Sequence, residues 1–216
     1  PPPPPPPRQS LTDSPGAAHQ VSRVMVPSLL ATIKEDASFG LEGGRSVMAT
    51  ALPTILPITS MTCLVGKLAL GSVTDRLGGS VILILVFGLF AGSSLGLMAT
   101  TSARVFGAMW VCNSLAYTSA WGAATQVIHA AFPKEEWPAQ LSSIASAGRL
   151  GAALGAIVYG SLLQRGLTWR QVFAVPAAVQ LLLVGLCVWQ HVTVARIKAA
   201  SAAADEAATA ASKDRK

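Results

Sequence analysis

The fold follows from one stretch, Gly71-Ser72-Val73-Thr74-Asp75-Arg76-Leu77-Gly78-Gly79-Ser80, which lies between two long apolar runs. The run from Met48 to Leu70 carries one charged residue, Lys67, and the run from Val81 to Thr100 carries none. Each run has about the 20 residues that a helix needs to cross the hydrocarbon core of a bilayer. The stretch therefore predicts a tight turn between two membrane-spanning helices, with its Asp-Arg pair at the water boundary.

The composition is that of a membrane protein. Of 216 residues, 51% are hydrophobic and 12% are charged, and the mean hydropathy is +0.51. The net charge is +6, but many basic residues flank the apolar runs or lie in the tail, as expected where helices stop at lipid headgroups. They do not form a cluster typical of nucleic-acid binding, so we expect no nucleic-acid partner.

Reactive groups are sparse in this sequence. Cys63, Cys112 and Cys187 all fall inside apolar runs, where small buried thiols are expected, and their spacing predicts neither a disulfide framework nor a metal site. No paired carboxylates, histidine cluster or nucleophile–base set lies within the apolar runs. We therefore expect no enzyme, no metal and no cofactor.

Four residues of the opening stretch carry a family resemblance. Gly71, Asp75, Arg76 and Gly78 form the pattern Gly-x-x-x-Asp-Arg-x-Gly, which resembles the signature loop of the major facilitator superfamily of membrane transporters. Many members continue with one or two basic residues, where this chain has Gly and Ser. The resemblance implies that the loop joins the second and third helices on the cytoplasmic side. It also implies that the Asp and Arg close a gate through contacts with neighbouring helix ends, and a helix amino-terminus would suit Asp75.

Other segments extend the resemblance over residues 23–192. The segment from Arg23 to Leu41 resembles the end of the family's first helix and the loop after it, although its apolar part, Val24 to Ile33, is too short to cross a membrane. An amphipathic surface segment is the alternative there. The loop from Phe132 to Trp137 and the pattern Trp169-Arg170-x-x-Phe173 also resemble family features.

The sequence is predicted to divide into four parts. Residues 1–22 are predicted to be a disordered, proline-rich tail, and residues 23–47 a remnant of the first helix and its loop. Residues 48–192 are predicted to form the helical bundle, and residues 193–216 an alanine-rich polar tail. Since the sequence has no initiator Met and no signal-peptide pattern, we expect a fragment of a longer protein.

Glycines at helical spacing predict close helix contacts in two of the runs. One set is Gly88, Gly92 and Gly96, and the other includes Gly151 and Gly155.

A polar stripe follows the run from Val105 to Phe132. Because a stripe of this kind faces lipid only at a cost, it predicts either a substrate cavity or hydrogen bonding between helices. His129, near Phe132-Pro133, is expected to be a boundary residue rather than a proton carrier. The stripe consists of Ser114, Thr118, Trp121, Thr125 and His129, with Asn113, Tyr117 and Gln126 beside it.

Two cations lie inside the apolar runs. Arg149 shares a helix face with Ser142 and Ser146, and a charge at that depth costs at least ~2.5 kcal/mol. We predict that Arg149 binds an anionic group in the cavity; snorkelling or pairing with a helix carbonyl is the alternative. For Lys67 we expect snorkelling towards the Asp75 end rather than substrate binding.

The resemblance implies an all-α membrane protein, with about five transmembrane helices that correspond to helices two to six of a six-helix half. We expect the amino-terminal half, with the carboxy-terminal half as the alternative. The implied function is secondary active transport of a small solute, an organic anion or a phosphate ester, by alternating access. The implied partners are the bilayer, the solute and the missing second half. The competing interpretation is a non-transporting helical membrane protein with a role in assembly or sensing.

Overall fold

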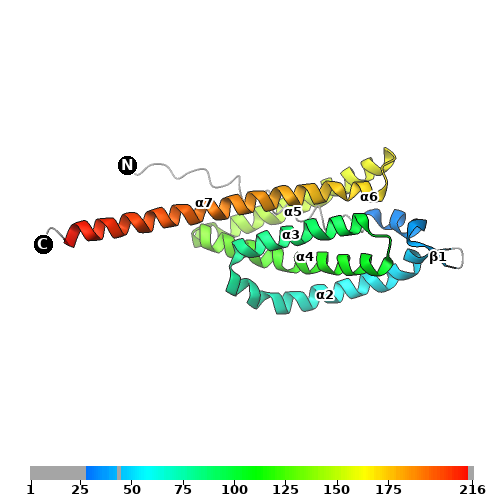
Figure 1. Cartoon of the computed structure of the whole chain (residues 1–216), viewed down its shortest axis with the longest axis horizontal. Coiled ribbons are helices and arrows are strands. Elements are labelled where there is room, and N and C mark those ends of the chain that lie inside the picture. The colour runs from blue at the N-terminus through cyan, green and yellow to red at the C-terminus, as the bar shows by residue number, and fades with distance from the viewer. Residues whose placement is uncertain (1–27, 43–44, 214–216) are drawn as a thin grey trace.

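A computed structural model describes residues 28–42 and 45–213 of the chain (Figure 1). Residues 28–35 are helical and are followed by the short helix η2, Ala37–Phe39. Two-residue strands, β1 (Leu41–Glu42) and β2 (Arg45–Ser46), then pair antiparallel. The predicted proline-rich tail of residues 1–22 lies outside the described residues.

Five long helices make up most of the described chain. They are α2 (Val47–Leu77), α3 (Gly79–Ala99), α4 (Ala103–Ala131), α5 (Trp137–Gln164) and α7 (Ala174–Lys213). The short helix η3 (Lys134–Glu136) precedes α5, and α6 (Trp169–Val172) precedes α7. The alanine-rich segment predicted as a tail is helical as far as Lys213, and α7 projects well beyond the other helices in Figure 1.

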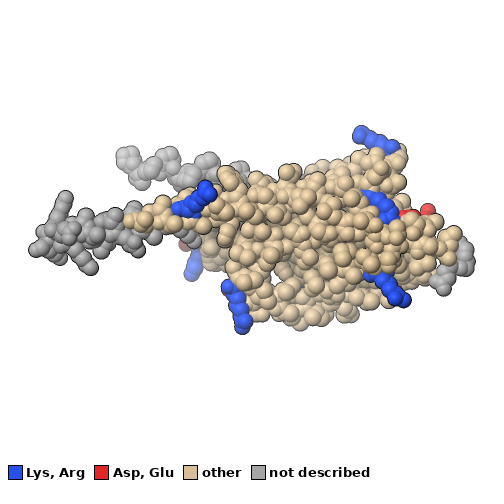
Figure 2. All heavy atoms as spheres, viewed as in Figure 1, with Lys and Arg blue, Asp and Glu red and all other residues tan. Residues whose placement is uncertain are grey.

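Among the residues that the structure describes, four segments are long and apolar enough to cross a membrane: Val47–Leu77, Gly79–Ala99, Lys134–Gln164 and Trp169–Ser201. The helix α4, with 29 residues, is as long as its neighbours, but its polar stripe lowers its hydropathy. It packs along both α2 and α3. The long helices thus pack side by side, with α4 between α2 and α3. The near face of the bundle shows basic side chains only towards the ends (Figure 2).

The predicted turn between α2 and α3 is shorter than the sequence suggests. Because α2 continues through Leu77 and α3 begins at Gly79, only Gly78 interrupts the helices, with φ of 82°. A residue with a side chain rarely adopts that backbone conformation. Gly79 is required for a different reason, since a Cβ there would lie 2.5 Å from the backbone oxygen of Ala123. This contact explains why a bulky basic residue is absent at position 79.

The bundle core forms where α3 meets α4 and α7. Large side chains of α3 pack against small ones of α4 in a cluster that contains Ile82, Val86, Phe87, Phe90, Ala116, Ala120, Ala123 and Leu183. A second cluster, at the end of the bundle away from Gly78, includes Phe39, Phe106, Trp169 and Phe173. A third joins the start of α5 to the end of α4 through Ile144, Ile128 and Phe132.

The glycines of α3 do not mark this packing face. Gly88 and Gly92 are exposed, and a Cβ on either would meet no described atom within 4 Å. Of the three glycines spaced four residues apart, only Gly96 approaches a neighbour, because its Cβ would lie 2.7 Å from the sulfur of Met109. On α5, by contrast, Gly151 and Gly155 are buried. The expectation of close packing at Gly88 and Gly92 therefore differs from what the described helices show.

Candidate functional site

Asp75 ties the end of α2 to α4. Its Oδ1 accepts a hydrogen bond of 2.6 Å from Nε2 of Gln126. Asp75 and its neighbour Arg76 are both exposed. The partner of Asp75 is thus a neutral amide near the carboxyl end of α4, and not the helix amino-terminus that we expected. Gly71 lies within α2 rather than in a loop, and a Cβ there would meet nothing within 4 Å.

The first half of the polar stripe on α4 packs against α2. Ser114 and Thr118 are both buried. The Cys63 thiol donates to the backbone oxygen of Ser114 at 3.6 Å, and a Cβ on Gly66 would lie 2.8 Å from Oγ1 of Thr118. The Thr118 hydroxyl itself donates to the Leu115 carbonyl of its own helix. These two residues therefore form a contact between helices and do not line open space.

Two of the three flanking residues of the stripe face α3 and the core, and the third, Gln126, bonds to Asp75. Asn113 is buried, and its Nδ2 donates to the Ser93 hydroxyl at 3.0 Å. Tyr117 is half-buried and packs against the α3–α4–α7 cluster. Neither side chain shares the exposed part of the stripe.

The second half of the stripe is open. Trp121 is 50% exposed, and the Thr125 hydroxyl donates to the Trp121 carbonyl. His129 is exposed and stacks on Trp137 with 3.8 Å between ring centroids, as a boundary residue would. On the helical wheel Trp121 lies between the positions that meet α2 (Ser114 and Thr118) and those that meet α5 (Ala124 and Ile128). The open strip of α4 thus lies between α2 and α5.

Arg149 lies on the exposed side of α5 together with Ser142 and Ser146. The opposite side of α5, which includes Ile144, is buried. Within the described part of the chain Arg149 makes no hydrogen bond or ion pair, and the described ion pair lies elsewhere, between Arg170 and Asp36. A mid-span cation is therefore presented on an open face of the bundle.

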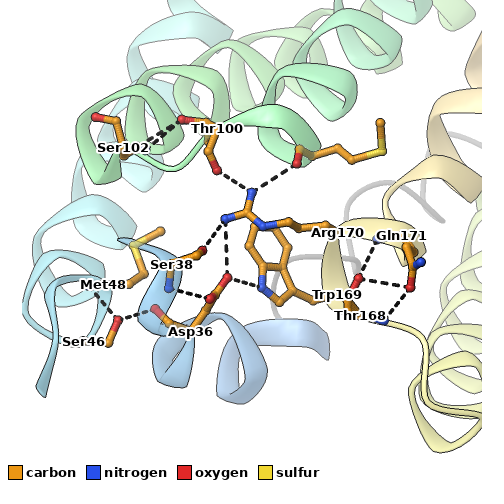
Figure 3. Close-up of polar contacts among 11 residues, drawn as sticks. Asp36, Ser38, Ser46, Met48, Thr100, Ser102, Thr168, Trp169, Arg170 and Gln171 are labelled. Carbon is orange, nitrogen blue, oxygen red and sulfur yellow. Dashed lines mark hydrogen bonds and ion pairs between the residues drawn. The ribbon is translucent and has the colours of Figure 1, made fainter. Parts of the chain in front are cut away.

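A polar cluster that sequence reasoning did not connect lies at the end of the bundle away from Gly78 (Figure 3). Asp36 Oδ2 accepts from Trp169 Nε1 at 2.7 Å and pairs with Arg170 Nη2 at 3.4 Å. Arg170 also donates to the carbonyls of Met98 and Thr100, and to the Ser38 hydroxyl at 2.6 Å. One guanidinium thus joins the segment before α2, the α3–α4 connection and α6.

Aromatic rings complete this cluster. The Arg170 guanidinium lies 4.4 Å from the ring centroid of Trp169 and 5.3 Å from that of Phe39, within the range of cation–π attraction. Burial alone would raise the pKa of Asp36. The hydrogen bonds from Ser38 and Trp169 and the charge of Arg170 outweigh it, so the pKa of Asp36 is lowered. Asp36 and Trp169-Arg170 each resembled family features in the sequence, but nothing there indicated that they touch.

Residues 17–214 match the family model described as Major Facilitator Superfamily. A search of curated proteins finds no match.

Proposed function

Because the chain belongs to the major facilitator superfamily, and is therefore an integral, multi-pass membrane transporter, we propose that it moves a small anionic solute by alternating access. In this proposal Arg149 binds the anionic group, and the Asp75–Gln126 contact is part of the gate at the cytoplasmic end. A second six-helix half provides the opposite wall of the site, since alternating access requires two units that rock around it.

The observation that carries the proposal is the placement of Arg149. It lies about 18 Å along the helix axis from Trp137, and its face is open. A guanidinium keeps its charge at any accessible pH, and its planar fork of donors fits a carboxylate or a phosphate. A cation at that depth is costly when it faces lipid. An aqueous path that admits anions would provide both the solvation and the partner.

The Asp75–Gln126 contact supports a gate of modest strength. A single exposed hydrogen bond contributes roughly 0.5–1.5 kcal/mol, which matches the few kcal/mol that separate interconverting states. Because it joins the end of α2 to α4, its loss lets these two ends separate without disturbing the core between α3, α4 and α7.

The test is uptake by proteoliposomes that carry the full-length protein, with Arg149→Lys and Arg149→Ala. Lys keeps the charge but loses the fork, so the half-saturation concentration for an anionic solute should rise about tenfold or more. Arg149→Ala should abolish uptake.

The matched control is Leu150→Ala, since Leu150 is also exposed on α5 but has no charge. Membrane insertion of every variant is checked by protease protection. Normal uptake by Arg149→Ala, or a transported solute that is neutral or cationic, would assign Arg149 a structural role.

A further inference from the structure

The formal charges inside the five long apolar runs are unbalanced. These runs are residues 48–70, 81–100, 105–132, 141–163 and 172–192. The charged residues in these runs are Lys67 and Arg149, which are both basic. All ten acidic residues of the chain lie outside the runs. Two cations therefore lie in the membrane-spanning part of the sequence without an acid in the same part. A charge near the centre of a membrane helix is costly to insert, so each of the two cations needs a reason.

Lys67 lies deeper than a snorkelling residue needs to. Its neighbour Gly66 packs against Thr118, close to the middle of α4. Asp75, which is level with Gln126, is roughly 12 Å further along the α2 axis. Helical side chains tilt towards the amino-terminus of their helix, so the Lys67 stem starts away from the Asp75 end. These contacts weigh against the snorkelling that the sequence suggested.

The contact between Gly66 of α2 and Thr118 of α4 has a surface, or flank, on each side, and the two flanks differ in polarity. On α2, Val65 and Lys67 project about 100° to either side of Gly66. The Val65 flank meets Leu115 of α4 in an apolar pocket of about 530 Å³, which Ile58 and Met61 also line. The Lys67 flank is therefore the other one. This second flank carries a cation, whereas the first is lined mostly by apolar side chains.

Trp121 belongs to the same flank as Lys67. On the α4 wheel Leu115 and Trp121 lie on opposite sides of Thr118, the residue that meets Gly66. Since Leu115 lines the apolar pocket, Trp121 lies on the Lys67 side. That side also leads to Ala124 and Ile128, which meet the start of α5. Lys67 is thus on the side of α2 nearest to α5, the helix that carries Arg149.

We propose that Lys67 and Arg149 are two cations of one substrate path, and that the substrate carries two negative charges, as a phosphate monoester or a dicarboxylate does. This inference rests on the proposed function and specifies its substrate class. Arg149 supplies the planar, bidentate contact, and Lys67 supplies a flexible point charge for the second negative charge. Both side chains are exposed on their helices, and the half-exposed Trp121 lies on the same side of α4 as Lys67.

Water access is tested first, in membranes that contain the full chain with Cys63, Cys112 and Cys187 replaced by Ala. Single cysteines are introduced as Lys67→Cys, Arg149→Cys and Leu68→Cys, and each is treated with an anionic and a cationic thiosulfonate reagent. Leu68 is the matched control, because it adjoins Lys67 and is 81% exposed but apolar. We expect Cys at 67 and at 149 to react, faster with the anionic reagent, and Cys at 68 not to react.

Charge pairing is tested next with Ser146→Cys, one turn from Arg149. Inorganic phosphate should protect this cysteine from labelling, and Lys67→Gln should raise the protecting concentration of phosphate about tenfold. The protecting concentration of formate, a monoanion, should change by less than about twofold. Lys67→Arg, which keeps the charge, should restore protection by phosphate.

The outcomes separate the two proposals. If the cysteine at 149 reacts faster with the anionic reagent but the cysteine at 67 does not react, the dianion inference fails and the proposed role of Arg149 stands. If Lys67→Gln weakens protection by phosphate and formate equally, Lys67 attracts any anion and does not pair with a second negative charge. The proposed substrate class is then wrong. If both cysteines are inert, the inference and the proposed function both fail.

Discussion

The two ends of the bundle are fastened in different ways. At the end away from Gly78, Arg170 joins three separate segments through an ion pair, carbonyl contacts and two aromatic rings. At the Gly78 end, Asp75 makes one exposed hydrogen bond to Gln126. A partly buried network with several bonds resists separation more than a single exposed contact does. The difference indicates that helix ends separate more easily near Gly78, which is where the family's gate is expected.

The largest effect should come from Arg170→Leu. This change leaves the Asp36 carboxylate without its cation and the carbonyls of Met98 and Thr100 without a donor. Hydrogen bonds to charged groups contribute about 1.5–3 kcal/mol each, so the free energy of unfolding should fall by roughly 2–3 kcal/mol. Chemical denaturation in detergent micelles measures it. Arg165→Leu is the control, since Arg165 is exposed at the end of α5; equal losses would contradict a special role for Arg170.

A comparable loss should follow Gly79→Ala at the other end. The added methyl would lie 2.5 Å from the Ala123 backbone oxygen, and overpacking of this kind costs about 1–3 kcal/mol. Gly71→Ala, two turns earlier in α2, meets nothing within 4 Å and should stabilise the helix by up to about 1 kcal/mol. Opposite signs in thermal unfolding are expected. A shared sign would show that α3 and α4 do not approach closely here.

The pH dependence should differ between the two ends. The folded-state pKa of Asp36 is lowered from 3.8, so its charged form stabilises the fold. This contribution is present above about pH 4 and is lost as the pH falls through the lowered pKa. Asp36→Asn should remove this acid-dependent part of the melting temperature between pH 6 and 3, while Asp75→Asn should leave it in place. An unchanged acid profile in Asp36→Asn would contradict the assignment.

The smallest effect on stability should come from Asp75→Asn. The exposed contact with Gln126 is lost or weakened, and the loss of one such hydrogen bond lowers the free energy of unfolding by roughly 0.5–1.5 kcal/mol at most. If the contact belongs to the gate, uptake should nevertheless fall in the full-length protein while its amount in the membrane stays normal. Gln126→Ala should show the same pattern. Unchanged uptake in both variants would make Asp75 an ordinary residue at a helix end.

The helices themselves could be predicted because a bilayer imposes a length on every apolar run. The boundary between α2 and α3 was less accessible, since Ser72, Thr74 and Asp75 are polar yet remain helical. The polarity marks where the lipid ends and not where the helix ends. Gly78 alone, with its positive φ, ends α2.

The partner of a polar side chain often belongs to another segment of the chain. The spacing of residues along one helix does not predict which residue of the other segment that is. Asp36 and Arg170 are separated by 134 positions, so their pairing arises only when the bundle assembles. The same limit applies to Gly88 and Gly92, which share a helix face as predicted but meet no described neighbour. For Ser114 and Thr118, the stripe indicated the polar face but not that α2 covers it.

The one-residue connection at Gly78 leaves no slack between α2 and α3. Consecutive Cα atoms are about 3.8 Å apart, so the end of α2 cannot shift by more than a few ångströms without pulling the start of α3. Gly79 is in turn pressed against Ala123 of α4. A displacement of α2 that carries Asp75 away from Gln126 must therefore either pull the start of α3 with it or bend the chain at Gly78.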